Sequence, residues 1–345
     1  MNILIYSPYI DTLGGGESYL FNFANCFLTQ HQVFLVWPDK KSVHQAARRF
    51  NLDLGKLIII PFLPPRSHLR QFDLVFFVSD GSLPFQPFTN TVVHFQVPFH
   101  HVGDRSLVNR FKLASINHIV CNSNFTKKYI DQEFGVNSQV IYPAVNTPSS
   151  LISKTSKSNL ILSVGRFTQS LHHKNQSALI DAFIKLEHQL PDWQLVLVGG
   201  TEPGSSQIIN RLKRQAYGHR IAVKTDISHQ ALINFYSQAK LYWHATGFGE
   251  DLVDYPERAE HFGISIVEAM AHQTVPLVFN AGGPKEIITP QSGFTWDSIP
   301  ELQSQTLQLA HHQTLRQKIA KAAQARSQFF NPDKFCQAFH DLLYA

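Results

Sequence analysis

The sequence predicts an α/β protein built from two doubly wound, Rossmann-like domains, and three observations lead to this expectation. The chain has 345 residues, a length at which α/β enzymes usually divide into two domains of roughly 150 residues each. Short apolar runs alternate with helical patterns in both halves of the chain, and a polar connector separates the halves. Hydrophobic residues make up 43% of the chain and charged residues 16%, which is enough apolar material for packed cores.

The first half contains a series of short apolar runs without polar alternation, which is typical of strands buried on both faces of a parallel sheet. Between the first two runs, residues 18–28 place apolar side chains at helical spacing, so the pattern is strand, helix, strand. The predicted strands of this half are 3–6, 33–37, 57–60, 74–78, 91–95, 118–121 and 139–142.

A connector rich in Ser, Thr, Lys and Pro covers 143–159, and it places the boundary between domains 1–150 and 151–328. After it the alternation resumes, with a predicted helix at 265–272. A last helix, about 333–344, carries an apolar stripe whose partner the pattern does not identify. The predicted strands of the second half are 160–164, 194–198, 221–224, 240–244 and 275–279.

The charge of the chain restricts the partners that it could bind, and its cysteine content indicates the compartment in which it acts. The net charge of +5 comes from scattered Lys and Arg without a basic block, so we expect no nucleic-acid partner, whereas phosphorylated donors or an acidic membrane surface would fit. Cys26, Cys121 and Cys336 are odd in number and far apart, which argues against a disulfide framework or a zinc site and favours a reducing, cytoplasmic location. No signal peptide and no apolar run of 18 residues is present, so we expect neither export nor a membrane span.

Three segments could carry chemistry, and the first is the glycine run Gly14-Gly15-Gly16-Glu17 after the first strand. Glycines let a ligand approach bare backbone N–H groups at a helix start, which suits an anion or a sugar. The run is not a GxGxxG motif, so dinucleotide binding is weakly supported. The alternative is a tight turn with no ligand.

The second segment follows strand 160–164, where Arg166 and Lys174 lie at the edge of the sheet at which open α/β folds bind ligands. A planar guanidinium and a mobile ammonium together suit a pyrophosphate. Without further context, two such cations could equally be solvated surface groups.

The third segment, residues 260–268, holds Glu260 and Glu268 seven residues apart across a loop-to-helix junction. Gly263 allows close approach of the backbone, and the helix start presents unpaired N–H groups to a diphosphate. The alternative is that Ser265 and Glu268 form a capping box, in which case Glu268 only stabilises its own helix.

Histidines give a weaker signal. His94 ends strand 91–95 at the same sheet edge, although a lone histidine is more often structural, and His100 and His101 compete for any role. The adjacent pairs at 172–173 and 311–312 cannot converge on one ion. We therefore expect no metal.

Together these segments resemble the retaining glycosyltransferases of family 4, which have the GT-B fold, over nearly the whole chain. Within that family the chain is similar to bacterial members that resemble the mannosyltransferases of lipid-linked oligosaccharides. The motifs that carry the resemblance are GGGE at 14–17, VGR at 164–166, LVLVGG at 195–200, the two glutamates of 260–268, EAMA at 268–271 and AGGPKEII at 281–288.

The resemblance implies two Rossmann-like domains facing across a cleft. Domain 1–150 would bind the acceptor, domain 151–328 would bind the nucleotide sugar, and a closing helix in 329–345 would pack back on the first domain. It implies that Arg166 and Lys174 neutralise the donor pyrophosphate, although an insertion at 168–173 makes the interval between them longer than is usual in the family.

The resemblance also implies roles for the remaining candidates. Glu260 would contact the transferred sugar and act in catalysis with Arg166 and His94. Of these, His94 would reach the donor sugar from the first domain. Glu268 would bind the ribose. The remaining expected donor contacts come from the backbone of Phe262, Gly263 and Ile264 and from the turn Thr225, Asp226 and Ile227 at the base, while Gly14, Gly15, Gly16 and Glu17 form a loop for the acceptor or a phosphate.

The expected function is therefore metal-independent, retaining transfer of a hexosyl group from a GDP- or UDP-sugar to a glycan or lipid-linked acceptor, without a cofactor. A sugar-nucleotide epimerase, a phosphorylase, a glycosidase using both glutamates and a non-catalytic sugar-nucleotide sensor stay open as alternatives. The cations at 40–41, 48–49 and 127–128 suit contact with anionic lipid at the inner face of a membrane, or are ordinary solvated charges. The oligomeric state is not predicted.

Overall fold

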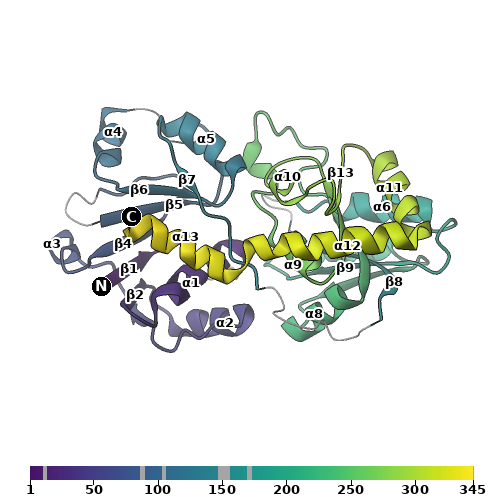
Figure 1. The fold of residues 1–345 in the computed structure, drawn as a ribbon, viewed down its shortest axis with the longest axis horizontal. Helices are drawn as coiled ribbons and strands as arrows, with labels where there is room; N and C mark the ends of the chain where they lie inside the picture. Colours follow the sequence, from purple (N-terminus) through teal and green to yellow (C-terminus); the bar gives the residue numbers. More distant parts are fainter. Residues whose placement is uncertain (11–13, 86–89, 103–105, 147–155, 169–172, 345) are drawn as a thin grey trace. The chain divides into compact units, whose positions relative to one another are not determined.

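The computed structural model describes residues 1–344 except 11–13, 86–89, 103–105, 147–155 and 169–172 (Figure 1). The chain forms two compact units. Unit 1 consists of Met1–Ala144 and Pro332–Ala345, and unit 2 consists of Val145–Asn331. The division after Ala144 falls inside the predicted connector, whose residues 147–155 lie outside the described part of the chain.

Unit 1 is built on a seven-stranded, all-parallel sheet in the order β3-β2-β1-β4-β5-β6-β7. The strand order reverses between β1 and β4, which is the doubly wound pattern that buries both faces of a sheet. The strands are β1 Asn2–Tyr6, β2 Gln32–Val36, β3 Ile58–Ile60, β4 Leu74–Val78, β5 Asn90–Phe95, β6 His118–Cys121 and β7 Gln139–Val140.

Helices cover this sheet, with α4 and α5 on the opposite side of the strands from α1 and α2 (Figure 1). Helix α5 begins and ends at residues that suit helix ends: the Ser123 hydroxyl caps it by accepting from the Thr126 N–H at 3.0 Å, and Gly135 ends it in the left-handed region. The helices of unit 1 are α1 Gly15–Phe27, α2 Lys40–Phe50, α3 Arg66–Leu69, α4 Leu107–Leu113, α5 Asn124–Phe134 and α13 Pro332–Tyr344.

The last helix, α13, belongs to the core of unit 1. Phe335 and Phe339 are buried among the aromatic side chains of α1, with ring centroids 4.9 Å from Tyr19 and 4.9 Å from Phe23 respectively. Aromatic pairs at this spacing contribute beyond the area that they bury. The apolar stripe seen in the sequence therefore completes the core of the first unit.

The cysteine prediction was wrong at this contact, because the structure holds a disulfide between Cys26 of α1 and Cys336 of α13, with Cα atoms 5.4 Å apart. The two residues are 310 positions apart in sequence, so only the return of α13 to α1 brings them together. Cys121 is free and buried. The disulfide removes the argument for a reducing compartment that rested on the cysteines.

Unit 2 is also doubly wound, and its six-stranded parallel sheet has the order β10-β9-β8-β11-β12-β13. Its strands are β8 Ser158–Val164, β9 Gln194–Gly199, β10 Ile221–Thr225, β11 Ala239–His244, β12 Val275–Phe279 and β13 Phe294–Trp296. Its helices are α6 Gln176–Leu186, α7 Ser206–Gln215, α8 His229–Gln238, α9 Ile264–Ala271, α10 Pro284–Ile287, α11 Ile299–His311 and α12 Gln313–Ser327, with short 3₁₀ turns at Pro256–Arg258 and Gln328–Phe330. Among the helices of the described residues, none is both long and apolar enough to cross a membrane.

Candidate active site

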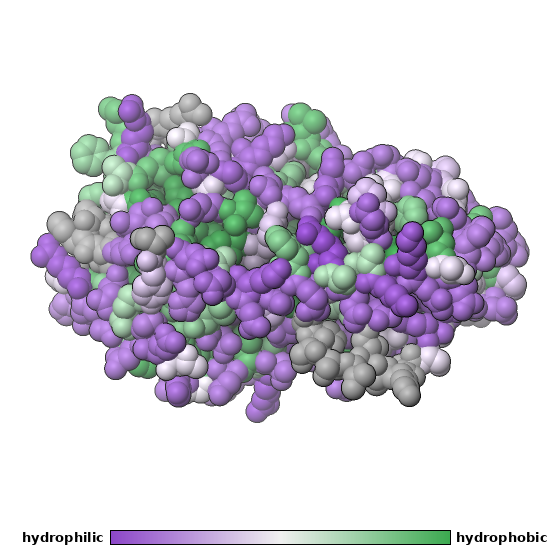
Figure 2. Space-filling view, viewed as in Figure 1, coloured by the Kyte–Doolittle hydropathy of each residue, from purple (hydrophilic) through white to green (hydrophobic). Residues whose placement is uncertain are grey.

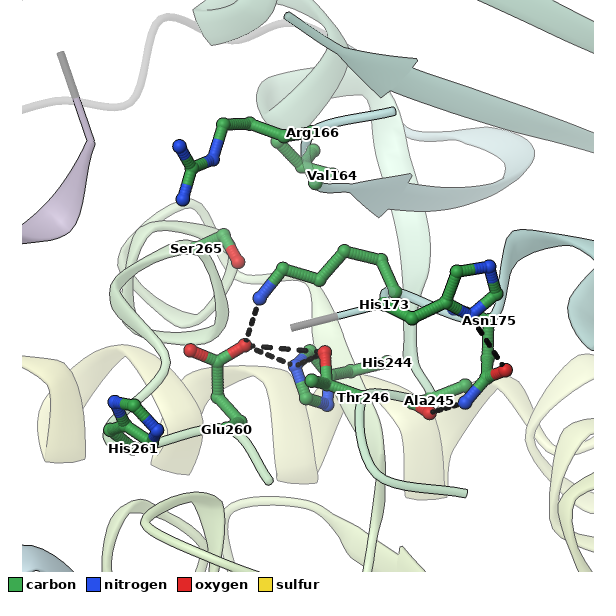
Figure 3. Close-up of polar contacts among 12 residues, drawn as sticks. Val164, Arg166, His173, Asn175, His244, Ala245, Thr246, Glu260, His261 and Ser265 are labelled. Atoms are coloured by element: carbon green, nitrogen blue, oxygen red, sulfur yellow. Dashed lines mark hydrogen bonds and ion pairs between the residues drawn. The ribbon is translucent and has the colours of Figure 1, made fainter. Parts of the chain in front are cut away.

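A cluster of polar side chains in unit 2 lies where the parallel strands end. Arg166 follows β8, Lys174 precedes α6, His244 is the last residue of β11, and Glu260 lies in the loop before α9. The carboxyl ends of parallel strands meet at one edge of a sheet, which is why residues so distant in sequence converge here (Figure 3).

Glu260 is the centre of this cluster. Its Oε2 accepts hydrogen bonds from Lys174 Nζ at 2.6 Å, His244 Nε2 at 3.0 Å and the Thr246 hydroxyl at 3.3 Å. Figure 3 shows the second carboxylate oxygen pointing away from these three donors. One carboxylate oxygen thus fixes the Glu260 side chain, and the other points away from these donors and can accept a further hydrogen bond.

The electrostatics keep Glu260 ionised. Burial alone would raise the pKa of its carboxyl, but the Lys174 ammonium and the His244 hydrogen bond outweigh burial and hold that pKa well below its ordinary value. A glycosidase acid needs a carboxyl whose pKa is raised. Glu260 does not fit that role, which disfavours the glycosidase interpretation in which it protonates the leaving group.

His244 was not among the residues predicted from the sequence. Burial lowers the pKa of its imidazole although the bond to Glu260 opposes this, so the ring is neutral and donates through Nε2. Its Nδ1 is buried and has no hydrogen-bond partner among the residues that the structure describes. A polar residue at the carboxyl end of predicted strand 240–244 was the available signal, and the same signal had identified His94.

The segment that carries Lys174 is fixed on both sides. Asn175 has a left-handed backbone (φ 50°), and its side-chain amide donates to the carbonyls of Ala245 at 3.1 Å and Phe248 at 2.7 Å. A Cβ atom on Gly165 would lie 2.8 Å from Lys174 Cγ. Glycine at this position therefore leaves room for the Lys174 side chain to pass close to the backbone. The preceding residues 169–172, most of the predicted insertion, lie outside the described part of the chain.

A pair of glycines holds the loop of Glu260 from the other side. The Gly283 N–H donates to the Glu260 carbonyl at 2.8 Å. A Cβ atom on Gly283 would lie 2.1 Å from the His261 carbonyl oxygen, and one on Gly282 would lie 2.3 Å from the Glu260 carbonyl oxygen. The glycines of the AGGPKEII segment therefore let two loops pack backbone against backbone.

The helix start at α9 differs from the capping-box alternative. The cap residue is Gly263 in the left-handed region (φ 112°), without a side-chain cap. Ser265 lies inside the first turn, where its hydroxyl accepts from Tyr242 at 2.8 Å, and Glu268 accepts from the Tyr236 hydroxyl at 2.8 Å. Of the first-turn N–H groups, that of Ile266 donates to the Gly263 carbonyl at 3.0 Å. No side chain caps this helix start, so a capping box does not occupy this end, where N–H groups are typically left without a partner in the helix.

Arg166 lies beside this helix start, and Figure 3 shows its guanidinium extending over Ser265. It is 37% exposed and forms an ion pair with Glu202 at 3.0 Å. The predicted pairing of Arg166 and Lys174 on one diphosphate stays a prediction, since Lys174 contacts Glu260 and Arg166 contacts Glu202.

The predicted base-binding turn follows β10. Asp226 has a left-handed backbone (φ 51°), and its carboxylate accepts from the Thr201 N–H at 2.9 Å and the Thr201 hydroxyl at 2.8 Å. It therefore fastens the loop after β9. Thr225 and Ile227 are partly exposed beside it, and base recognition by these three residues stays a prediction.

The candidates of unit 1 lie in its own core and at its own helix start. His94 is fully buried, stacked on Tyr19 with ring centroids 3.8 Å apart, and burial lowers the pKa of its imidazole to about 3. A buried, neutral ring would have to become accessible before it could contact a sugar. Its assigned role in catalysis stays a prediction.

The glycine run of unit 1 begins helix α1. Gly14 is the cap, and the Glu17 carboxylate turns back to accept from its N–H at 2.9 Å, so Glu17 stabilises its own helix. A Cβ atom on Gly16 would lie 2.1 Å from the Gln96 amide oxygen. The run therefore has a packing role, and binding of an acceptor or phosphate there stays a prediction.

The described residues contain no group of three or more His, Cys, Asp or Glu side chains that could hold a metal ion. The positive charge next to Glu260 comes from Lys174, whose ammonium lies 2.6 Å from the carboxylate.

Two protein-family models match the chain. The model for glycosyl transferases group 1 matches residues 151–326, and the model for glycosyltransferase family 4 matches residues 13–148. A curated relative is the human GDP-Man:Man(3)GlcNAc(2)-PP-Dol alpha-1,2-mannosyltransferase, 28% identical over 243 residues that represent 63% of this chain and 46% of the relative. The chain thus spans about half the length of that relative.

Solved structures resemble the chain over nearly all of its length. A glycosyltransferase from Rickettsia africae has a TM-score of 0.74 at 18% identity and covers 99% of this chain and 98% of its own. The Anabaena protein HepE, in complex with UDP, has a TM-score of 0.75 at 19% identity and covers 100% of both chains. These likenesses confirm the predicted GT-B fold class.

Proposed function

The chain belongs to glycosyltransferase family 4, and from this premise we propose that it transfers a hexosyl group, with retention of configuration, from a nucleotide diphosphate sugar to a glycan or lipid-linked acceptor. The observation that carries the proposal is Glu260, which is ionised, fixed through one oxygen by Lys174 and His244, and next to the uncapped start of α9. The Glu260 carboxylate can accept a hydrogen bond from a sugar hydroxyl, and the start of α9 can bind the departing diphosphate.

The proposed chemistry breaks the bond between the anomeric carbon and the phosphate oxygen, and the electron pair stays on the diphosphate. Arg166, Lys174 and the first-turn N–H groups of α9 stabilise the charge that develops there. The acceptor hydroxyl oxygen bonds to the anomeric carbon on the face that the diphosphate leaves, and its proton passes to a phosphate oxygen. The enzyme then needs neither a nucleophile of its own nor a metal ion.

The other predicted contacts complete the proposal. Glu268 binds the ribose, the backbone of Phe262–Ile264 binds the sugar and phosphates, and the turn at 225–227 holds the base. The acceptor binds unit 1, with the Gly14–Glu17 helix start as its site and His94 as a contact to the donor sugar.

The nature of donor and acceptor is the finer part of the proposal. The human relative is named for GDP-mannose and a dolichyl-diphosphate oligosaccharide, and HepE was solved with UDP. We therefore propose a GDP- or UDP-sugar as donor, and a lipid-linked glycan as the first acceptor to test. No cofactor is required in this scheme, and the protein acts at the cytoplasmic face of a membrane.

The donor can be identified before the acceptor is known. Thermal unfolding is measured with GDP, UDP and their mannose, glucose, galactose and N-acetylglucosamine conjugates, with EDTA present throughout. A ligand at about 100 times its Kd should add roughly 2.7 kcal/mol to the free energy of unfolding. Stabilisation by no nucleotide, or only when a divalent ion replaces EDTA, would contradict the proposal.

Transfer itself is then tested with the selected donor and a polyprenyl-diphosphate glycan, and the product anomer is read by NMR. Retention with no turnover in the absence of acceptor supports the proposal. Conversion of the donor without acceptor would indicate an epimerase, dependence on inorganic phosphate would indicate a phosphorylase, and binding without turnover would indicate a sensor.

A further inference from the structure

Two tyrosine hydroxyls hold one face of helix α9. Tyr242 of β11 donates to the Ser265 hydroxyl at 2.8 Å, and Tyr236 of α8 donates to Glu268 Oε2 at 2.8 Å. Ser265 and Glu268 are three positions apart, so they lie on the same side of the helix. Hydrophilic residues predominate on the face of unit 2 drawn in Figure 2, whereas both tyrosine rings are buried. Each hydroxyl therefore supports a residue of α9 from within the protein.

Tyr236 is fixed by its backbone and by its ring as well as by its hydroxyl. Its carbonyl accepts from the Thr274 hydroxyl at 2.8 Å, and its ring stacks on His272 with centroids 5.6 Å apart. The His272 imidazole in turn donates through Nδ1 to the carbonyl of Glu268 at 2.8 Å. Tyr236 and His272 thus hold the same residue, one by its side chain and the other by its backbone.

Helix α9 places Glu268 one turn beyond the proposed diphosphate site. Glu268 follows Ile264, the first residue of the helix, by four positions, which is about 6 Å along the axis on the same side of the helix. In a nucleotide a single methylene joins the ribose to the α-phosphate, so the ribose lies at a comparable distance from the diphosphate. Glu268 is partly exposed, and a ligand can reach its carboxylate.

A carboxylate that is already oriented binds a hydroxyl more tightly than a mobile one. Immobilising a flexible side chain during binding lowers the affinity by about two- to twelvefold, and a hydrogen bond made beforehand removes part of that loss. An ionised carboxylate has about four acceptor positions, so the Tyr236 hydroxyl can hold Oε2 without excluding a ribose hydroxyl. The alternative is that this bond only ties α8 to α9.

We propose that Tyr236 is a positioning residue for the donor nucleotide: its hydroxyl holds the Glu268 carboxylate in the orientation that accepts hydrogen bonds from the ribose hydroxyls. Tyr236 is 2% exposed, so it acts through Glu268 and not by contact with the donor. The inference rests on the proposed function, in which Glu268 binds the ribose, and it adds the residue that sets the strength of this recognition.

The test compares nucleotides that differ only in the ribose hydroxyls. Binding of GDP, UDP and their 2′,3′-dideoxy analogues to the full chain is measured by isothermal titration calorimetry in the presence of EDTA. The wild type should prefer the ribonucleotide by at least about tenfold, as expected for a hydrogen bond to a charged group. Tyr236→Phe should bind the ribonucleotide about fivefold more weakly and the dideoxy analogue within twofold of the wild type.

A double-mutant cycle tests whether Tyr236 acts through Glu268. Glu268→Ala should lose most of the preference for the ribonucleotide. Adding Tyr236→Phe to Glu268→Ala should then weaken binding by no more than about twofold, because the residue through which Tyr236 acts is already gone. A further fivefold loss in the double variant would overturn the proposal.

Tyr242→Phe is the matched control, because it removes an equally buried hydroxyl from the same side of α9. Its partner Ser265 lies at the diphosphate end, so any effect should be equal for the ribonucleotide and its dideoxy analogue, and the preference should persist. All variants should unfold within about 5 °C of the wild type, which excludes loss of the fold.

The outcomes separate this inference from the proposed function. A wild type that binds neither GDP nor UDP refutes both. A wild type that prefers the ribonucleotide supports the donor site, and the inference alone is overturned if Tyr236→Phe keeps the full preference or weakens both nucleotides equally. Equal weakening is the result expected if the Tyr236–Glu268 bond serves only to join the two helices.

Discussion

The substitution Arg166→Ala separates the proposed chemistry from fold stability. The Arg166–Glu202 pair is 37% and 32% exposed, and exposed ion pairs contribute only about 0–1 kcal/mol to stability. The variant should therefore unfold within about 4 °C of the wild type. Its folded structure should be intact.

The effect on transfer should be much larger. If Arg166 stabilises the departing diphosphate, its loss resembles removal of one oxyanion donor, about 3 kcal/mol in the transition state. That corresponds to a fall of roughly 150-fold in kcat/KM. The assay is the initial rate of sugar transfer at donor concentrations far below KM, with thermal unfolding measured on the same samples.

Glu202→Gln is the matched control, because it breaks the same ion pair and leaves the guanidinium in place. It should change the transfer rate less than about threefold, as expected for an exposed pair. A rate in Arg166→Ala within threefold of the wild type, or an equal loss in both variants, would refute the reasoning.

Three further predictions concern the contacts around the site and the disulfide. Lys174→Met should lower stability at pH 7, and the deficit should shrink as the pH falls below about 4: the pKa of Glu260 is depressed in the folded protein, so its contribution exists above the ordinary carboxyl pKa and disappears as the carboxyl protonates. A deficit independent of pH in thermal unfolding would contradict this. Cys26→Ser should cost about 2–5 kcal/mol in denaturant unfolding, and reductant should lower the wild type to the same level without affecting the variant. Gly283→Ala should displace the loop of Glu260, because the new Cβ would lie 2.1 Å from the His261 carbonyl oxygen; normal transfer and normal thermal stability together would disprove it.

Most of the fold could be predicted because both sheets are parallel and buried on both faces, so their strands appear as continuous apolar runs. The runs at 74–78 and 275–279, for example, are the strands β4 and β12. The short edge strand Phe294–Trp296 was missed, since three residues carry no periodic signal.

The site was predictable only in part. Glu260 and Lys174 were found because one lies in a motif and the other follows a strand, and the structure joins them at 2.6 Å. His244 was missed although its place at the carboxyl end of predicted strand 240–244 was a signal. Asn175 was missed because its role depends on the carbonyls of Ala245 and Phe248, which spacing along the chain does not reveal. The disulfide was missed because the resemblance implied only that the last helix packs on the first domain, and not which residues of that domain it contacts.

The return of α13 to unit 1 also sets the order in which the chain can fold during translation. Phe335 and Phe339 leave the ribosome only after the whole of Val145–Asn331. Until then the aromatic side chains of α1 lack two of their core partners, while unit 2 already has all of its strands. We therefore expect the second unit to reach its native state on the nascent chain before the first, so that the residues synthesised earliest are among the last to be protected from chaperones and proteases.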